Sequence, residues 1–282
     1  MTIYETVTNN IIAAIEAGAG ENGFTCPWGG GTTPAPLRHC GTPYRGINVL
    51  ILWITAKARG YTAPTWMTYR QAAAIGGQVR KGERGSAVVY SGTVTKEDES
   101  GEEASRFNFL KSYTVFNAQQ IDGLPEVHTV APAPVNQEER RADVDAFFAK
   151  TGSVIIEGQG ASYMPGPNLI EMPAYERFTS AGGYYATLAH EHVHWTGHPS
   201  RLDRDLKNKF RSKPYAFEEL IAEIGAAFVC STLDIEGVHI TDHASYVAGW
   251  LKVLRDDDKA IFRAASAAQQ AADYLLEKGR PV

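Results

Sequence analysis

The chain has 282 residues, of which 44% are hydrophobic, so it can form one large domain or two smaller ones with buried cores. Its net charge of −5 argues against a protein that is basic throughout, although an average of this kind can hide a basic patch. Three scattered cysteines, the lack of a signal-peptide pattern and the lack of an apolar run near ~20 residues predict a cytoplasmic location and no membrane partner.

The first part of the chain mixes predicted helices and strands. Apolar residues on one side of residues 2–17 and an apolar run over 47–59 predict two helices, and a short third helix is expected over 68–75. Residues 87–94 and 106–116 have the pattern of paired strands, joined by an acidic turn. A first domain with α+β structure is therefore expected.

A proline-rich stretch over 124–135 predicts a linker. We place one domain over residues 1–128 and a second over 129–282. The elements expected in the second domain are a helix over 143–150, a strand over 153–157, short strands within 163–173, a helix over 182–194, a helix over 215–228 and a helical region over 243–278.

The motif H-E-x-x-H over 190–194 predicts a metal site. Residues four apart share one helix face, so His190 and His194 can direct both imidazoles at one ion, with Glu191 as the general base. Catalytic zinc usually has a third protein ligand. Glu219 and Glu223 lie four apart on an otherwise apolar helix, where buried carboxylates need a cation nearby. From the residues alone, either glutamate can be the third ligand.

The Glu219–Glu223 pair resembles the E-x-x-x-D/E element of gluzincin metallopeptidases. That resemblance implies that Glu219 binds the metal and that Glu223 supports a ligand histidine. Zinc is the expected ion, and manganese also suits such ligands. Around the site we expect an exposed Glu218, no role for His192 and a helix-end position for His198. Further candidates are Tyr246 and His243 as oxyanion donors and residues 169–172 as the edge strand that binds a peptide.

Local charge in the first part predicts a nucleic-acid interface. Residues 38–84 carry eight Lys and Arg residues against one acid, Glu83, with aromatic residues between them. Cations follow phosphates and unpaired bases stack on exposed rings, so this composition favours single-stranded nucleic acid. The candidate residues are Arg38, Tyr44, Arg45, Lys57, Arg59, Trp66, Tyr69, Arg70, Arg80, Lys81 and Arg84. The alternative is a solvated basic face, with Trp66 or Tyr69 filling the core.

Seven segments in order resemble the ArdC-type antirestriction proteins of conjugative plasmids. They lie at residues 43–48, 64–71, 76–83, 116–124, 190–198, 215–228 and 264–274. The resemblance implies a single-stranded-DNA-binding N-terminal domain and a zincin-like metallopeptidase domain. It further implies that the protein shields DNA entering a recipient cell from restriction. The competing interpretation is a DNA-dependent or stand-alone metalloprotease that acts on a host protein, with DNA binding only targeting it.

Overall fold

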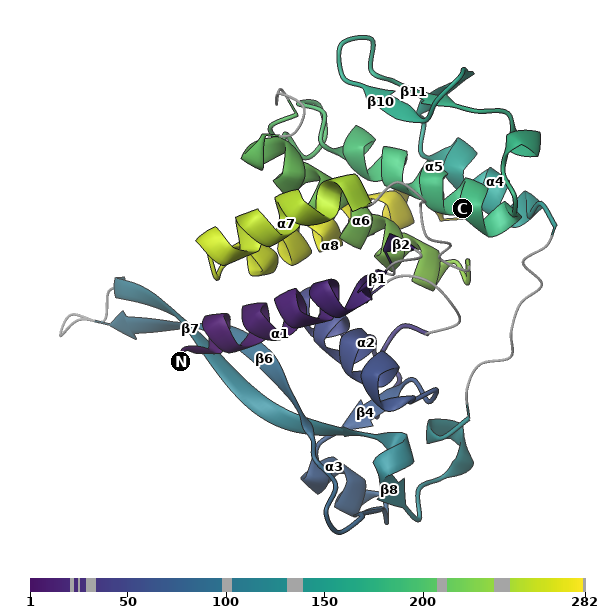
Figure 1. Cartoon of the computed structure of the whole chain (residues 1–282). Coiled ribbons are helices and arrows are strands. Elements are labelled where there is room, and N and C mark those ends of the chain that lie inside the picture. Colours follow the sequence, from purple (N-terminus) through teal and green to yellow (C-terminus); the bar gives the residue numbers. More distant parts are fainter. Residues whose placement is uncertain are drawn as a thin grey trace.

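The computed structural model of the chain describes residues 1–20, 23–24, 26–28, 34–97, 103–130, 139–206, 212–235 and 244–280. Helices carry most of the body and several small sheets lie at its periphery, which confirms the predicted α+β class (Figure 1). Among the described residues, no helix combines the length and the hydropathy needed to cross a membrane.

The first helix, α1 (Ile3–Gly18), begins at a capping box. The Glu5 amide donates to Thr2 Oγ1 at 3.1 Å and the Thr2 amide donates to a Glu5 carboxylate oxygen at 2.6 Å, so both backbone donors are satisfied. The predicted second helix is confirmed as α2 (Ile47–Arg59), which ends at Gly60 in the left-handed region. The short helix is α3 (Tyr69–Ala74).

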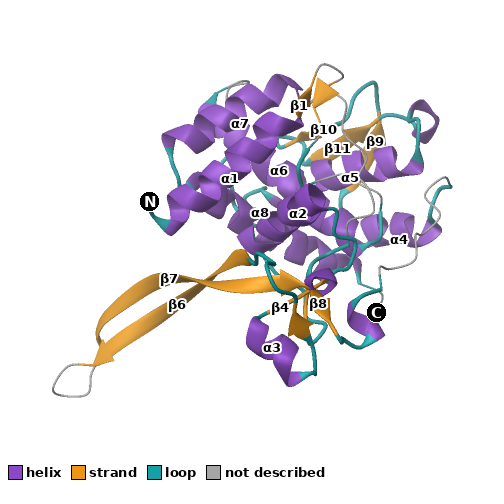
Figure 2. Ribbon diagram, turned by 60° about the horizontal axis from the view of Figure 1, so that its bottom comes forward, coloured by secondary structure: helices purple, strands orange, loops and turns teal. Residues whose placement is uncertain are grey.

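A long hairpin formed by β6 (Ser86–Glu97) and β7 (Glu103–Asn117) projects from the helical body (Figure 2). Both strands are longer than predicted, and residues 98–102 of the expected acidic turn lie outside the described residues. At its base the hairpin joins a four-stranded sheet of order β3-β4-β7-β6. The other short elements of this part are β1 (Ala19–Gly20), β2 (Gly23–Phe24), β3 (Leu37–Arg38), β4 (Thr65–Met67), β5 (Gln78–Val79) and β8 (Ile121–Asp122).

The second part places a small sheet beside a group of helices (Figure 1). The sheet has the order β10-β11-β9, with β11 antiparallel to β10 and parallel to β9. The elements are α4 (Ala142–Lys150), β9 (Val154–Glu157), β10 (Ser162–Met164), β11 (Leu169–Met172), α5 (Ala181–Thr196), α6 (Lys213–Thr232), α7 (Ala244–Asp256) and α8 (Ala260–Gly279). The predicted C-terminal helical region is therefore divided into two helices, with a break at residues 257–259.

One hydrophobic core includes residues from both parts of the chain. Trp28 packs beside Trp250 of α7, with ring centroids 6.3 Å apart, and Trp53 of α2 packs beside Phe228 of α6 at 5.8 Å. Tyr4 of α1 makes an edge-to-face contact with Phe262 of α8. The two parts are thus packed against each other, and the boundary between residues 128 and 129 stays a prediction.

Candidate metal centre

Helix α5 presents two imidazoles on one face. Ser180 caps the helix by accepting a hydrogen bond from the Gly183 amide at 3.1 Å. His190 and His194 are one turn apart, and their Nε2 atoms lie only 3.1 Å from each other. The predicted geometry of the motif is therefore present in the fold.

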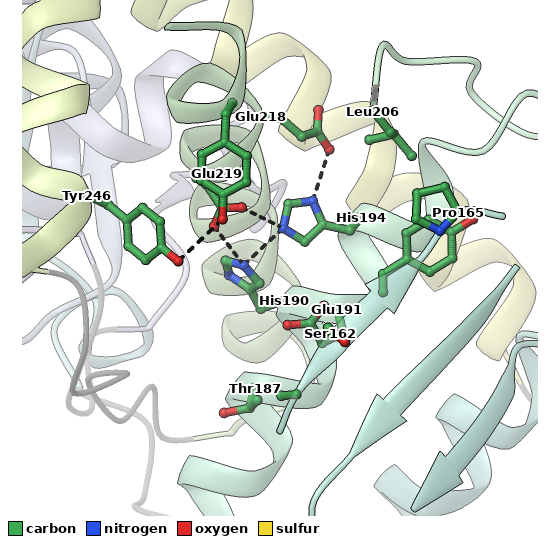
Figure 3. A pocket seen from close by; sticks show the side chains of 13 residues that line it. Ser162, Pro165, Thr187, His190, Glu191, His194, Leu206, Glu218, Glu219 and Tyr246 are labelled. Carbon is green, nitrogen blue, oxygen red and sulfur yellow. Dashed lines mark hydrogen bonds and ion pairs between the residues drawn. The ribbon is translucent and has the colours of Figure 1, made fainter. Parts of the chain in front are cut away.

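Helix α6 crosses α5 and adds a carboxylate. Glu219 Oε2 lies 3.4 Å from His190 Nε2, and Glu219 Oε1 lies 3.5 Å from His194 Nε2. A tetrahedral zinc ion with bonds of about 2.0–2.1 Å separates its ligand atoms by about 3.3–3.4 Å. Because the three separations fall close to that value, His190, His194 and Glu219 are spaced as metal ligands are (Figure 3).

The far nitrogens of both imidazoles face carboxylates. His194 Nδ1 lies 3.2 Å from Glu218 Oε1, and His190 Nδ1 lies 3.6 Å from Glu223 Oε2. In a neutral imidazole that donates from Nδ1, the lone pair is on Nε2. Two lone pairs and the Glu219 carboxylate then converge on one point, and only a cation makes that arrangement favourable.

The pKa shifts indicate the same preference for positive charge. Burial lowers the pKa of His194, but Glu218 and Glu219 outweigh burial and raise it to about 9. Burial likewise opposes charge on His190, yet Glu219 and Glu223 hold its pKa well above the ordinary value. For Glu219, burial raises the pKa, and the two histidines reverse this effect and lower it. The surrounding carboxylates therefore favour positive charge on the two imidazoles.

Glu218 contradicts the sequence prediction. It was expected to be exposed, and it is 7% exposed. Arg204 Nη2 donates to Glu218 Oε1 at 2.8 Å, and the same arginine donates to Val193 O at 2.6 Å and Thr196 Oγ1 at 2.9 Å. Arg204 thus fixes Glu218 against the back of His194. The charge of Arg204, which lies 14 residues before Glu218 on a different segment, is what allows a carboxylate to be buried there.

The three candidate ligands line a cavity of about 330 Å³ together with Glu191. Tyr246, a predicted oxyanion donor, also lines it, whereas His243 lies outside the described residues. Tyr215, which was not predicted, lines the cavity too, and its hydroxyl is 3.4 Å from that of Tyr246. Burial and the Tyr246 hydroxyl raise the pKa of Tyr215, so its phenol stays protonated. Its position one turn before Glu219 was the signal that could have identified it.

The expected peptide-binding edge strand is wrong. Residues 169–172 form β11, which is the central strand of its sheet and has partners on both sides. The edge strands are β9 and β10, and residues Ser162 and Tyr163 of β10 line the cavity. Hydropathy marked β11 as a strand but could not give its position in the sheet.

The two remaining histidines of this region lie away from the convergence point. His192 is fully buried on another side of α5, where its Nε2 is 2.9 Å from Ser153 Oγ and its Nδ1 is 2.7 Å from Leu188 O. Burial lowers its pKa to about 4, so it packs as a neutral group. His198 follows the end of α5 and contacts Ser200. Both positions agree with the predictions.

The cations predicted for nucleic-acid binding are exposed, but several have partners in the protein. Arg80 pairs with Glu83 at 2.9 Å and with Asp122 at 3.2 Å. Lys57 donates to Cys26 O at 3.0 Å, and Arg59 donates to the carbonyl of Arg84. The structure thus gathers Arg59, Arg80, Lys81 and Arg84 around the glycine-rich loop over 76–85.

The other predicted cations lie apart from that loop group. Tyr69 and Arg70 are exposed on the adjacent α3, and Tyr69 is 51% exposed. Arg45 pairs with Asp273 of α8, which ties it to the second part of the chain. Arg38 lies over the ring of Tyr44, 5.5 Å from its centroid.

Two of the predicted aromatic contacts need correction, because Tyr44 and Trp66 are 5% and 1% exposed. Trp66 lies on β4 in an edge-to-face contact with Tyr61 at 5.8 Å. Their rings are covered, so they cannot stack on bases in this conformation. A tryptophan in a short apolar strand fills the core, and composition alone did not distinguish that role from a binding surface.

Two family models match the chain. The N-terminal domain of the anti-restriction factor ArdC matches residues 1–116, and a zincin-like metallopeptidase family matches residues 142–267. Among curated proteins, the chain is 43% identical over 285 residues to the uncharacterised protein y4eC of Sinorhizobium fredii (strain NBRC 101917 / NGR234), covering 97% of this chain and 91% of that protein. It is 39% identical to a DNA primase TraC of Escherichia coli, of which it covers 27%.

Solved structures also place the chain close to ArdC. The metal-free crystal structure of the antirestriction protein ArdC from plasmid R388 has a TM-score of 0.85 and 48% identity, covering 99% of this chain and 98% of that one. The Mn(II)-bound structure of the same ArdC has a TM-score of 0.82 and 47% identity. With its ArdC-type N-terminal domain and zincin-like C-terminal domain, the chain belongs to the ArdC family of antirestriction proteins.

Proposed function

We propose that this protein binds single-stranded DNA and protects incoming plasmid DNA from host restriction during conjugation. Membership in the ArdC antirestriction family carries this proposal. Exposed cations in the first part support it, among them Arg38, Arg70, Lys81 and Arg84, since cations of this kind can follow a phosphate backbone. Restriction endonucleases of the host must reach the DNA to cut it. A protein bound along the entering strand can limit their access to that DNA.

We further propose that the second domain holds one divalent cation through His190, His194 and Glu219. The spacing of the three ligand atoms carries this part, and the Mn(II)-bound form of the R388 ArdC supports it. Imidazole and carboxylate ligands suit zinc, which we take as the first candidate, and also manganese. When bound, such an ion supplies Lewis acidity toward a carbonyl and a water.

Several of the protein's own groups support peptide hydrolysis as the chemistry of this site. Glu191 lines the cavity and can accept a proton from a water and return it to a leaving amine. Glu218 contacts His194 from behind at 3.2 Å, and Glu223 faces the far nitrogen of His190 at 3.6 Å. Tyr215 and Tyr246 can donate hydrogen bonds to a developing oxyanion. The edge strand β10 can bind an extended peptide by main-chain pairing.

A second candidate function is a metalloprotease that acts on a host protein, with DNA binding only targeting it. The cavity beside Glu191, flanked by a sheet edge, favours this alternative. If the leading proposal holds, coating of the DNA protects it. If the second candidate holds, cleavage of a host protein protects it.

The variant Glu191→Gln separates the two functions. We expect it to keep its metal and to bind single strands as wild type does, while peptide hydrolysis falls by roughly 10²–10⁴-fold. Under the leading proposal, plasmid protection in a restricting recipient is unchanged. Loss of protection with intact strand binding would instead establish the protease. A strand-binding titration at several salt concentrations tests DNA binding itself, because phosphate contacts weaken as salt rises.

A further inference from the structure

The two faces of the β6–β7 hairpin have different environments. On one face Val89 is buried and Leu110 is packed against the hydrophobic core. The opposite face carries the cross-strand pairs Val88–Tyr113, Tyr90–Lys111 and Gly92–Phe109, because directly paired residues share a face. At the base of the hairpin this second face is buried too, at Ser86, Val88 and Val115, and farther out along it Tyr90 and Lys111 are exposed.

That second face is aromatic. Tyr90 is 57% exposed, Tyr113 is 38% exposed and Phe109 is half-buried, and the rings of Tyr90 and Phe109 are 6.0 Å apart. We name these three residues the aromatic stripe. Exposed rings grouped on a projecting hairpin are typical of a surface that binds a partner.

Gly92 sets the orientation of one ring. A Cβ atom at position 92 would lie 2.5 Å from Phe109 Cζ, so only glycine leaves room for the ring to lie across the strand. Lys111 Nζ lies over this ring, 5.0 Å from its centroid, which places a cation next to the aromatic side chains.

The stripe continues to a second cation at the base of the hairpin. Tyr113 lies close enough to Tyr44 to raise the pKa of that phenol, although burial is the larger cause, and the guanidinium of Arg38 lies over the Tyr44 ring at 5.5 Å. Lys111 and Arg38 therefore flank the three rings. Aromatic faces with cations along their edge are the combination that single strands require, since bases stack and phosphates are neutralised.

The spacing of side chains along a β-strand favours an unpaired, extended DNA strand as the ligand over a DNA duplex. Side chains on one face of a strand repeat every ~6.7 Å, about twice the ~3.4 Å rise per nucleotide of a stacked strand. Bases can reach successive rings only when they are unstacked, and a duplex hides its base faces. We propose that Tyr90, Phe109 and Tyr113 stack on unpaired bases of single-stranded DNA, with Lys111 and Arg38 contacting its phosphates.

This proposal rests on the DNA-binding function proposed above and gives it a surface. The test is fluorescence anisotropy of a labelled, mixed-sequence single strand with the full-length protein. Each lost stack should weaken binding roughly tenfold, so Tyr90→Ala should lose about tenfold and Tyr90→Ala/Phe109→Ala about 100-fold. Tyr90→Phe keeps the ring and should bind as wild type does. Val154→Ala removes an exposed apolar side chain on β9 and should also leave binding unchanged.

An abasic strand separates stacking from charge. Wild type should bind the normal strand more tightly than the abasic strand, and Tyr90→Ala/Phe109→Ala should lose that preference while its salt dependence stays the same. Since Phe109→Ala can disturb the hairpin, the exposed Tyr90→Ala gives an independent reading. If wild type binds the single strand and Tyr90→Ala retains full affinity, the proposed role of the aromatic stripe in DNA binding is wrong, while the proposed function stands. If wild type does not bind single strands at all, the proposed function itself fails.

Discussion

Glu218 and Glu219 are neighbours in sequence, yet they meet opposite sides of His194. Glu219 Oε1 lies 3.5 Å from Nε2, and Glu218 Oε1 lies 3.2 Å from Nδ1. The first carboxylate therefore occupies the position that we propose for a metal ligand, and the second contacts the opposite side of the imidazole. Arg204 anchors Glu218 in turn. A histidine held on both sides cannot rotate away from the convergence point without breaking one of these contacts.

This arrangement makes Glu218→Gln a test of metal affinity. The amide keeps the shape of the side chain but removes the charge that orients His194 and raises its basicity. We expect divalent-metal affinity to fall roughly 10–100-fold, measured by competition with a chelator for Zn(II) or Mn(II). Glu126→Gln, an exposed substitution, serves as the control. Unchanged affinity in a Glu218→Gln protein with wild-type circular dichroism would contradict the assigned role.

Sequence spacing predicted the residues that share one helix but not those that meet across helices. His190 and His194 follow from the i, i+4 rule, and Glu219 followed from a burial argument with a family pattern. Glu218 was misjudged because its partner, Arg204, lies on a different segment. Tyr44 and Trp66 were misjudged for a related reason: composition records that a ring is present and not which face of the fold covers it.

At the scale of elements, the metal centre depends on how closely α5 and α6 approach. A Cβ atom at Gly225 would lie 2.9 and 3.0 Å from the two methyl groups of Val193. Both residues are buried, and the valine is stiff at χ1, so it has little freedom to move aside. Gly225 thus permits the contact that brings Glu219 to the histidines.

A double-mutant cycle tests this contact. Gly225→Ala alone should destabilise the protein by roughly 1–3 kcal/mol, because overpacking outweighs the gain in helix propensity. In a Val193→Ala background the space is open, and the same substitution should stabilise by up to about 1 kcal/mol. Urea unfolding of the four proteins gives both values. The same sign in both backgrounds would show that the close approach is not the reason for glycine here.

The individual elements were predictable because their periodicity is local. The helix over 47–59 coincides with α2, and the helices carrying His190 and Glu219 were expected from their apolar spacing. Strand order was not predictable, since hydropathy identifies β11 as a buried strand and β10 as a weaker one without saying which forms the edge. The shared face of two hairpin rings could have been inferred from sequence, because Phe109 and Tyr113 are four residues apart within the predicted strand over 106–116.

At the scale of the whole molecule, the two domains make contacts with each other that could not be predicted from the sequence of either domain. The Gly46 amide donates to the side chain of Gln269 at 2.9 Å, and Thr8 Oγ1 donates to Asp258 O at 2.6 Å. Arg45 pairs with Asp273. The pattern of an amphipathic helix shows that one face is buried but does not identify the element that covers it. The proline-rich stretch therefore predicted two domains, and the sequence did not show how they pack against each other.

We therefore predict that residues 139–282 do not fold cooperatively on their own. In isolation Trp250 loses Phe24 and Trp28, and Phe228 loses Trp53. Deleting one buried aromatic ring costs roughly 3–5 kcal/mol, and a domain of this size has only about 5–15 kcal/mol of stability, so losing several partners removes most of it. Urea unfolding followed by tryptophan fluorescence should give a broad transition for the fragment and a single sharp one for the full chain. Adding residues 1–128 in trans should sharpen the fragment's transition, because they restore the missing faces of α7 and α8. A fragment that unfolds as sharply as the intact protein would mean that the shared core is dispensable for the second domain.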